Sequence, residues 1–289
     1  MCIRDRSNGE LVEEYEKNMS KAEYKAAIEK CIENIYSGEI IQVVFSQRLT
    51  KKTKASAIEI YRCLRTINPS PYMFLLNLDD FQILGASPEL LVKSSNKQLS
   101  VHPIAGTRPR GVDSEEDEKI ANELINDEKE LAEHLMLLDL GRNDVGRVSM
   151  PGSVNVNQKM EIEKYSHIMH IVSNVTGTLK DELDEFDALR AAFPAGTVSG
   201  APKVRAMQLI SELEPEKRGP YSGGVGYFSY NGNMDTCIAI RTLVLKDETV
   251  YIQAGGGIVA DSKVENEYEE TLNKMMALIR SVDEAERNL

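Results

Sequence analysis

Apolar residues recur at helical spacing in six stretches of the chain. The first stretch is the clearest, because Tyr24, Ile28 and Cys31 form one apolar stripe. Ser20 and Glu23 stand at its start with the spacing of a capping box, which marks the beginning of a helix. The pattern predicts helices over residues 21–37, 57–66, 115–140, 184–193, 201–213 and 264–283.

Short apolar runs between these helices predict β-strands. The runs cover residues 40–46, 72–78, 81–85, 90–93, 99–103, 223–230, 236–245 and 249–254. The four runs between 72 and 103 are separated by tight turns and resemble an antiparallel meander, and Asn231-Gly232 predicts a hairpin. Residues 105–113 are expected to form a loop of Gly, Pro and Arg. Meanders with helices grouped between them indicate an α+β fold with antiparallel sheets.

Composition narrows the class of protein. The 289 residues are 42% hydrophobic, which is enough for a sizeable core, and one domain is expected because no linker divides the chain. The net charge of −12, without a basic stripe, argues against a nucleic-acid partner. No apolar run approaches the roughly 20 residues of a membrane span. The four cysteines are too far apart for a zinc or redox pair, so a reducing, cytoplasmic setting is the default.

Two charged residues lie among apolar neighbours. Glu89 follows Ser87-Pro88 and precedes an apolar run, where the ionised carboxyl is disfavoured and a general acid is possible. The alternative is an ordinary Glu that faces solvent. Arg241 is expected inside the strand 236–245 and needs an anionic partner. A buried ion pair within the protein and a ligand carboxylate explain it equally well.

Two Glu-x-x-Glu pairs place carboxylates on one helical face each. They are Glu130 with Glu133 and Glu267 with Glu270. Four such carboxylates would suit Mg²⁺, which binds hard oxygen ligands and retains water. With 46 acidic residues such pairs also arise freely, and Glu270 with Lys274 is equally explained as a surface ion pair.

Glycine-rich segments and a histidine leave further alternatives open. Residues 196–203 precede a predicted helix and offer either an anion site at its start or simple capping by Ser199. Residues 255–257 either let the backbone approach a ligand or only turn the chain. His170 is more often a packed core residue than a base. Together the candidates indicate a small di-anionic ligand that meets Mg²⁺, Arg241 and Lys274.

Seven segments in combination resemble the chorismate-utilising enzymes. They are QVVFSQR at 42–48, NPSPYM at 68–73, GASPE at 85–89, PIAGTRPRG at 103–111, DLGRND at 139–144, FPAGTVSGAPK at 193–203 and AGGGIV at 254–259. The resemblance covers residues 19–289, which are interpreted as the chorismate-binding catalytic domain. Residues 1–18 are interpreted as an unmatched leader or linker, of which 1–7 match nothing in the family.

The resemblance implies an α+β fold with a large antiparallel β-sandwich flanked by helices. It is strongest with the aminating subunits that act as Mg²⁺-dependent lyases in tryptophan biosynthesis. Those enzymes convert chorismate and ammonia to aminodeoxyisochorismate, which loses pyruvate to become anthranilate. A glutamine amidotransferase subunit supplies their ammonia, so such a partner and Mg²⁺ are expected here, in the cytoplasm and without nucleic acid or membrane.

Roles follow for individual residues from the same resemblance. Glu89 matches the acid that protonates the departing ring hydroxyl, Thr197 its hydrogen-bond partner, and His170 the residue that transfers a proton during pyruvate loss. The substrate-binding set comprises Gly106, Thr107, Tyr221, Arg241, Gly255, Gly257 and Lys274. The Mg²⁺ ligands match Glu133 and Glu270, with Glu130 and Glu267 as supports through water. Half of a tryptophan effector site matches Asn68, Pro69, Ser70, Pro71, Tyr72 and Met73.

Two departures from the family keep alternatives open. Full-length members are far longer, so the chain is interpreted as lacking an N-terminal regulatory portion, and a catalytically inactive chorismate-binding fragment remains an alternative. Ala105 stands where many folate-branch members, which make aminodeoxychorismate, and water-adding relatives carry lysine. A methyl group can neither attack the ring nor activate water, which favours external ammonia. Some folate-branch members also lack this lysine, so that branch stays an alternative.

Overall fold

The computed structural model describes residues 7–165 and 168–288. These residues form two compact units, and the chain passes between them several times. The first unit comprises Met1–Pro88, Val198–Gly223 and Ala239–Leu289, and the second comprises Glu89–Thr197 and Gly224–Ile238. Each unit is built on one seven-stranded sheet.

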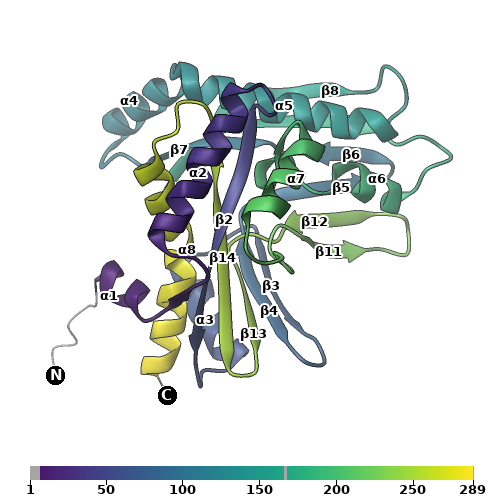
Figure 1. Ribbon diagram of the computed structural model, residues 1–289. Helices are drawn as coiled ribbons and strands as arrows, with labels where there is room; N and C mark the ends of the chain where they lie inside the picture. Colours follow the sequence, from purple (N-terminus) through teal and green to yellow (C-terminus); the bar gives the residue numbers. More distant parts are fainter. Residues whose placement is uncertain (1–6, 166–167, 289) are drawn as a thin grey trace. The chain divides into compact units, whose positions relative to one another are not determined.

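The sheet of the first unit has the strand order β1-β2-β14-β13-β4-β3, and β10 pairs with β2 (Figure 1). All of these pairs are antiparallel. Its strands are β1 (Glu16–Lys17), β2 (Gln42–Lys52), β3 (Tyr72–Asn77), β4 (Gln82–Ser87), β10 (Gly200–Ala201), β13 (Thr242–Lys246) and β14 (Thr249–Ile258). Its helices are α1 (Asn8–Glu13), α2 (Lys21–Tyr36), α3 (Ala57–Ile67), α7 (Lys203–Leu213) and α8 (Val264–Arg287).

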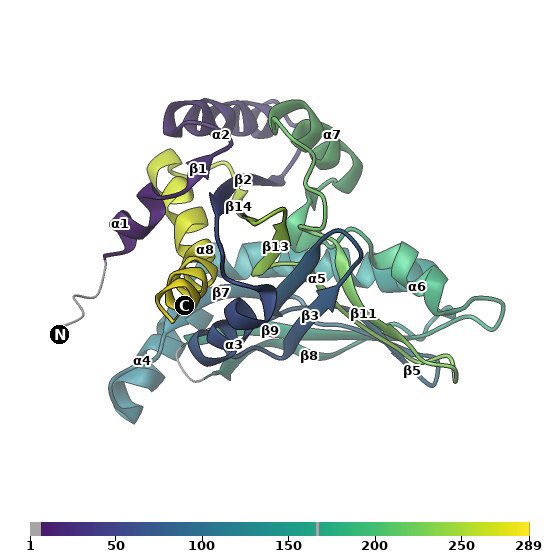
Figure 2. The ribbon, with the colours of Figure 1, turned by 90° about the horizontal axis from the view of Figure 1, so that it is seen from below.

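The core of the first unit lies between this sheet and its helices. Alternate residues of β2 and β14, such as Leu49 and Ile252, are fully buried beside Met275 and Ile279 of α8. A second cluster joins α2 and α7, which lie side by side in Figure 2, to β2 through Phe45. This packing fixes α8 against β14, and both elements carry candidate site residues.

The second unit has the strand order β11-β12-β5-β6-β9-β7, with β8 paired to β9, and all pairs are antiparallel. Its strands are β5 (Leu90–Ser95), β6 (Gln98–Val101), β7 (Ile104–Pro109), β8 (Asn155–Lys164), β9 (Ile168–Thr178), β11 (Gly224–Phe228) and β12 (Met234–Ile238). Its helices are α4 (Ser114–Ile125), α5 (Glu128–Val148) and α6 (Glu185–Ala192). Leu124, Met169 and Ile171 pack together where α4 meets β9.

The predicted fold class is confirmed, because antiparallel sheets with helices make up both units. The first predicted helix is α2, and it begins as expected. The N–H of Ser20 donates to the Glu23 carboxylate at 2.7 Å, and the N–H of Glu23 donates to the Ser20 hydroxyl at 3.2 Å. The Asn231-Gly232 dipeptide joins β11 to β12 in the predicted hairpin. The division at residue 18 stays a prediction, although α1 and β1 belong to the first unit.

Several element predictions were wrong. The expected helix 115–140 is two helices, because the Asp127 side chain caps a new helix by accepting from the N–H groups of Lys129 and Glu130. The expected loop 105–113 begins as β7, which pairs with β9. The meander is divided, since β3 and β4 join one sheet and β5 and β6 join the other. The long strands β8 and β9 were not predicted.

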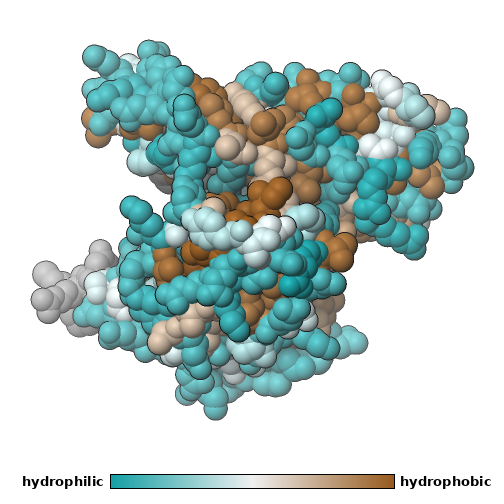
Figure 3. Space-filling view, turned by 45° about the horizontal axis from the view of Figure 1, so that its top comes forward, coloured by the Kyte–Doolittle hydropathy of each residue, from teal (hydrophilic) through white to brown (hydrophobic). Residues whose placement is uncertain are grey.

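The face of the molecule in Figure 3 is mostly hydrophilic, with scattered apolar patches. This agrees with a chain in which 28% of residues are charged. Within residues 7–165 and 168–288, no helix combines the length and apolar character that crossing a bilayer requires.

Candidate active site

The predicted site residues fall on both units, and within each unit some of them lie together. The first unit carries Tyr221, Arg241, Gly255, Gly257, Glu267, Glu270 and Lys274. The second unit carries Glu89, Gly106, Thr107, Glu130, Glu133, His170 and Thr197.

Arg241 provides a positive charge in the first unit. It does not continue a strand, as the sequence pattern predicted, but precedes β13 with a φ of 50°. Burial lowers the pKa of its guanidinium, which shows that it is poorly hydrated. Its Nη1 donates to the backbone carbonyl of Lys274, and within the described part of the chain no carboxylate forms an ion pair with it. A direct ion pair within the protein is therefore not formed, although the nearby Glu270 carboxylate favours the charged guanidinium. The remaining N–H groups suit an anionic ligand.

Lys274 brings a second cation close to the glycines of β14. Its Nζ donates to the carbonyl of Gly255 at 3.0 Å and lies 2.5 Å from Oε1 of Glu270. The expected surface ion pair is thus confirmed. Gly255 lies inside β14 and opposite Ser46 of β2, so the alternative of a simple turn at 255–257 was wrong.

Tyr221 adds a hydrogen-bond donor to this cluster. A Cβ atom on Gly255 would lie 3.0 Å from the Tyr221 hydroxyl and 2.9 Å from the carbonyl oxygen of Phe45, so the backbone approach requires glycine. Burial raises the pKa of Tyr221, which keeps the hydroxyl protonated at neutral pH. The first unit therefore gathers two cations and a neutral O–H donor around one stretch of β14.

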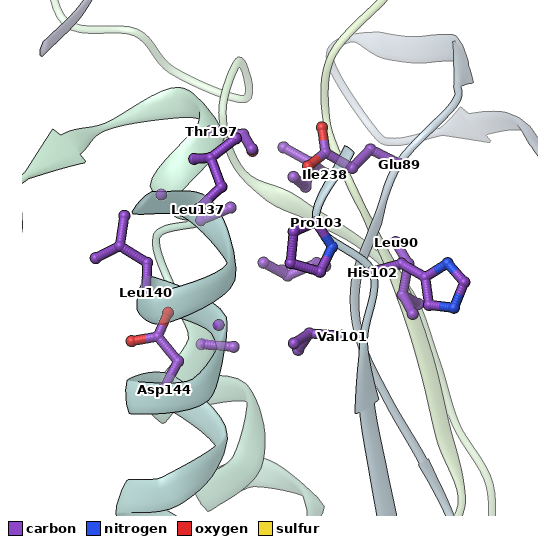
Figure 4. Close-up of a pocket in the computed structure, with 15 residues that line it drawn as sticks. Glu89, Leu90, Val101, His102, Pro103, Leu137, Leu140, Asp144, Thr197 and Ile238 are labelled. Carbon is purple, nitrogen blue, oxygen red and sulfur yellow. The ribbon is translucent and has the colours of Figure 1, made fainter. Parts of the chain in front are cut away.

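In the second unit, Glu89 and Thr197 line one pocket of about 50 Å³ (Figure 4). Glu89 is only 8% exposed, so the interpretation as an ordinary solvent-facing Glu was wrong. Its carbonyl accepts from the N–H of Ile238 at 3.0 Å, which fixes the start of β5. Figure 4 shows Glu89 and Thr197 on opposite walls at the same end of the pocket.

The Thr197 hydroxyl has unused hydrogen-bonding capacity. Its Oγ1 is buried and has no hydrogen-bond partner among the residues that the structure describes. Thr197 is in a single 3₁₀ turn, Gly196–Val198, that precedes β10. A buried hydroxyl without a partner is costly, so its presence beside a pocket favours a ligand or water as its partner.

Sequence reasoning assigned no role to two polar residues of this pocket. Asp144 and His102 also line it, and burial lowers the pKa of His102. Asp144 belongs to the DLGRND segment and projects from α5. The DLGRND segment drew attention to Asp144, but the spacing of its residues did not indicate that Asp144 would face a pocket.

His170 is half-buried on β9 beside the bulge of β7, where Gly106 adopts a φ of +59°. The His170 Nδ1 lies 3.1 Å from the Gly106 carbonyl and 3.0 Å from the Thr107 hydroxyl. Because a carbonyl only accepts, the contact with Gly106 is a hydrogen bond in the tautomer that carries its proton on Nδ1. In that tautomer Nε2 is the basic nitrogen.

The two Glu-x-x-Glu pairs differ in their surroundings. Oε1 of Glu130 accepts from Arg108 at 3.0 Å, while Glu270 pairs with Lys274. Among residues 7–165 and 168–288, no group of three or more His, Cys, Asp or Glu side chains is placed to hold a metal ion. Mg²⁺ commonly uses only one or two protein carboxylates beside water and substrate, so the chemistry of each pair fits this ion.

For the segment 196–203, the alternative of helix capping by Ser199 was wrong, and the alternative of an anion site stays a prediction. The helix α7 begins at Lys203 with Pro202 as its N-cap, so Ser199 does not cap it. The intervening Gly200–Ala201 pairs with β2 instead. The effector segment 68–73 joins α3 to β3, and its role stays a prediction.

Comparison with known proteins shows the family to which the chain belongs. The chain matches the chorismate binding enzyme family over residues 3–280, and it belongs to this family. The match includes residues 3–18, so the expectation that this stretch has no counterpart in the family was wrong. It is 56% identical over 282 residues to anthranilate synthase component 1 of Cereibacter sphaeroides, covering 98% of this chain and 56% of that protein. It is 54% identical over 271 residues to the Aquifex aeolicus protein of the same name, with coverages of 94% and 55%.

The solved structures that resemble this chain include a protein of the same name as these relatives. Anthranilate synthase component I from Streptococcus pneumoniae matches with a TM-score of 0.86 and 46% identity, covering 92% of this chain and 59% of that one. An isochorismate synthase from Bacillus anthracis matches with a TM-score of 0.84 and 28% identity, with coverages of 93% and 74%. The chain thus spans just over half the length of the anthranilate synthase components that it matches.

Proposed function

We propose that this chain is the catalytic part of an anthranilate synthase component I, which converts chorismate and ammonia to anthranilate and pyruvate for tryptophan biosynthesis. Family membership and the identities of 54 to 56% to proteins of that name support the proposal. The structural observation that carries it is the Arg241, Lys274 and Tyr221 cluster, which offers two cations and a donor, with one carboxylate, Glu270, paired to Lys274 and none bonded to Arg241.

The cluster in the first unit would bind the enolpyruvyl carboxylate of chorismate. The guanidinium of Arg241 has free N–H groups, and a charge-assisted hydrogen bond to a carboxylate is stronger than one to a neutral acceptor. Lys274 adds a point charge and the Tyr221 hydroxyl donates. Gly255 and Gly257 leave room for the ligand to approach the backbone of β14.

In the second unit, Glu89 would donate a proton to the departing ring hydroxyl, which leaves as water. Thr197 would hold that oxygen or the carboxyl group through its free Oγ1. Ammonia then forms a bond to the ring carbon next to the one that bears the carboxylate, and the proton that its nitrogen loses restores Glu89. The product of this half-reaction is aminodeoxyisochorismate.

His170 would serve in the second half-reaction. Its Nε2 removes the proton from the aminated ring carbon, and the C–O bond to the enolpyruvyl group breaks. That group leaves as pyruvate after its methylene carbon gains a proton, and the ring becomes aromatic. The contact of Nδ1 with the Gly106 carbonyl holds the imidazole in the tautomer that this step needs.

Mg²⁺ is the proposed cofactor, and the carboxylates of Glu133 and Glu270, supported by Glu130 and Glu267, are its proposed ligands. When bound, the ion would neutralise and polarise the ring carboxylate of the substrate. We further propose a glutamine amidotransferase subunit, anthranilate synthase component II, as the source of ammonia, and the cytoplasm as the location.

Ala105 supports external ammonia as the nucleophile. It lies in β7 opposite Ile171 of β9, and its methyl group cannot form a covalent adduct with the ring. The folate-branch alternative, aminodeoxychorismate synthase, would stop at the aminated intermediate with nitrogen on a different ring carbon.

The test is an assay with chorismate, Mg²⁺ and ammonium, with the product identified by fluorescence and mass. Anthranilate supports the proposal, aminodeoxychorismate would assign the folate branch, and no product from a folded chain would indicate an inactive fragment. Arg241→Gln is expected to raise KM by about 10- to 100-fold, because a charged hydrogen bond is worth roughly 1.5 to 3 kcal/mol. Arg205→Gln, which removes an exposed ion pair with Glu39, is the matched control.

A further inference from the structure

Arg218 is the centre of a buried polar network in the first unit, close to Tyr221 but outside the set of predicted site residues. Its Nε and Nη2 form a bidentate ion pair with Glu214, at 2.8 and 2.6 Å. Nη1 and Nη2 also donate to the carbonyls of Val198 and Val44, both at 2.6 Å. A fifth bond runs from Nη1 to the Ser222 hydroxyl at 3.1 Å. These five bonds match the five N–H donors of a guanidinium.

Glu214 extends this network into the sheet. Its Oε1 accepts from the backbone N–H and the hydroxyl of Ser46 on β2, at 2.9 and 2.7 Å. Ser46 in turn accepts from the Gln253 amide of β14 at 2.8 Å. The Glu214 side chain is only 4% exposed and that of Arg218 14%. Burial acts to lower the pKa of Arg218, but the Glu214 carboxylate outweighs it and raises the pKa, so the guanidinium stays charged.

The network acts on Tyr221 from two sides. The Arg218 guanidinium lies over the Tyr221 ring, with its central carbon 5.5 Å from the ring centroid. Tyr221 also lies in a tight turn that the Gly223 N–H closes onto the Pro220 carbonyl at 3.0 Å. In this turn Ser222 has a φ of 68°, a conformation that favours glycine or asparagine. The bond from Arg218 to Ser222 therefore holds a strained turn in place.

We infer that Arg218, paired with Glu214, is a positioning residue that fixes the Tyr221 hydroxyl for carboxylate binding. A buried ion pair gains little net stability over apolar packing, whereas it fixes geometry when every donor is used. Arg218 forms no bond with Arg241 or Lys274 within the described residues, and Tyr221 is the candidate site residue that it contacts directly. The inference depends on the proposed function only for the identity of the carboxylate ligand that the Tyr221 hydroxyl binds.

Arg218→Lys is the variant that tests this inference, because lysine keeps the charge but cannot make the bidentate pair and the three further bonds. Arg205→Lys, at an exposed arginine of α7 that pairs with Glu39 and Glu212, is the matched control. Both variants are first compared with the parent chain by thermal unfolding, so that only folded proteins are assayed.

The first measurement is independent of substrate. The chain is labelled with 3-fluorotyrosine, and the ¹⁹F resonance of Tyr221 is identified by its loss in Tyr221→Phe. Arg218→Lys should shift and broaden this resonance, and Arg205→Lys should not. An unchanged Tyr221 resonance in folded Arg218→Lys would overturn the inference.

The second measurement is the kinetics with chorismate and ammonium. In the proposed function Tyr221 binds the enolpyruvyl carboxylate, which itself forms and breaks no covalent bond. Arg218→Lys should therefore raise KM by about 10-fold while kcat changes by less than about twofold. In the Tyr221→Phe background the same substitution should have little further effect. Equal effects in both backgrounds would contradict an action through Tyr221. Failure of the parent chain to bind chorismate would instead refute the proposed function, and the fluorine measurement would still decide the inference.

Discussion

The two units of the chain hold their polar side chains in opposite ways. In the first unit Lys274 is held by Glu270 and by the carbonyl of Gly255, and Arg241 donates to the carbonyl of Lys274. In the second unit Glu89 and Thr197 face a small pocket, and the Thr197 hydroxyl has no partner within the described residues. Tight fixation suits the binding of a permanent charge, whereas proton transfer needs groups that can change partners. Under the proposed function, this contrast would give substrate binding to the first unit and proton transfer to the second.

The largest effect is expected from Glu89→Gln. The amide keeps the shape of the side chain but cannot give up a proton as a carboxylic acid does, so kcat should fall by about 10²- to 10⁴-fold. KM for chorismate should change little, in contrast to Arg241→Gln. Steady-state kinetics with saturating ammonium measures both. A raised KM with normal kcat would show that Glu89 binds substrate instead of transferring a proton. The difference in role between the two units would then be wrong.

A smaller effect is expected from Thr197→Val, which replaces a hydroxyl by a methyl of similar size. Loss of one hydrogen bond in the reaction should lower kcat by about tenfold. The unfolding temperature should not fall, because the hydroxyl has no partner within residues 7–165 and 168–288. Thr178→Val, which removes an exposed bond from Gln98, is the control and should leave kcat unchanged. A loss of stability without loss of activity would make Thr197 purely structural.

The smallest effect concerns acid stability of the second unit, which depends on Asp117. Hydrogen bonds from Arg110, then the Gly111 N–H and Lys164, hold the pKa of this carboxyl well below its ordinary 3.8. A depressed folded-state pKa gives stability that is present above about pH 4 and is lost as the pH falls further. The urea midpoints of the parent and Asp117→Asn should therefore differ at pH 7 and converge below about pH 4. A difference that does not change with pH would contradict this.

Local signals in the sequence predicted the elements that local interactions determine. The capping box at Ser20 and the Asn231-Gly232 turn were found because their bonds lie within a few residues. Glu89, the glutamate pairs and Arg241 were found as candidates, and the resemblance supplied their roles. The two glycine segments and His170 were noticed with their alternatives open.

Features that depend on distant segments could not be predicted. Arg241 was expected to follow strand alternation, but the chain leaves the strand before β13 and its positive φ has no local signature. Arg218 stands in a run of charged residues that is typical of a solvated surface, and its partners Val44 and Val198 are far away in sequence. Asp127 looked like one more acidic residue of a long helix until its capping bonds showed a break.

The place of β2 in its sheet has a consequence for biosynthesis. This strand is made early, and its neighbours β10 and β14 come from residues near 200 and 250. The whole Glu89–Thr197 segment, which belongs to the other unit, must be synthesised before β10 exists. Long-range pairing of this kind makes folding slow and leaves strand edges exposed while the chain emerges from the ribosome. The apolar residues Val43, Val44 and Phe45 therefore form a segment prone to aggregate in the nascent chain, and chaperones that bind extended apolar segments should act there.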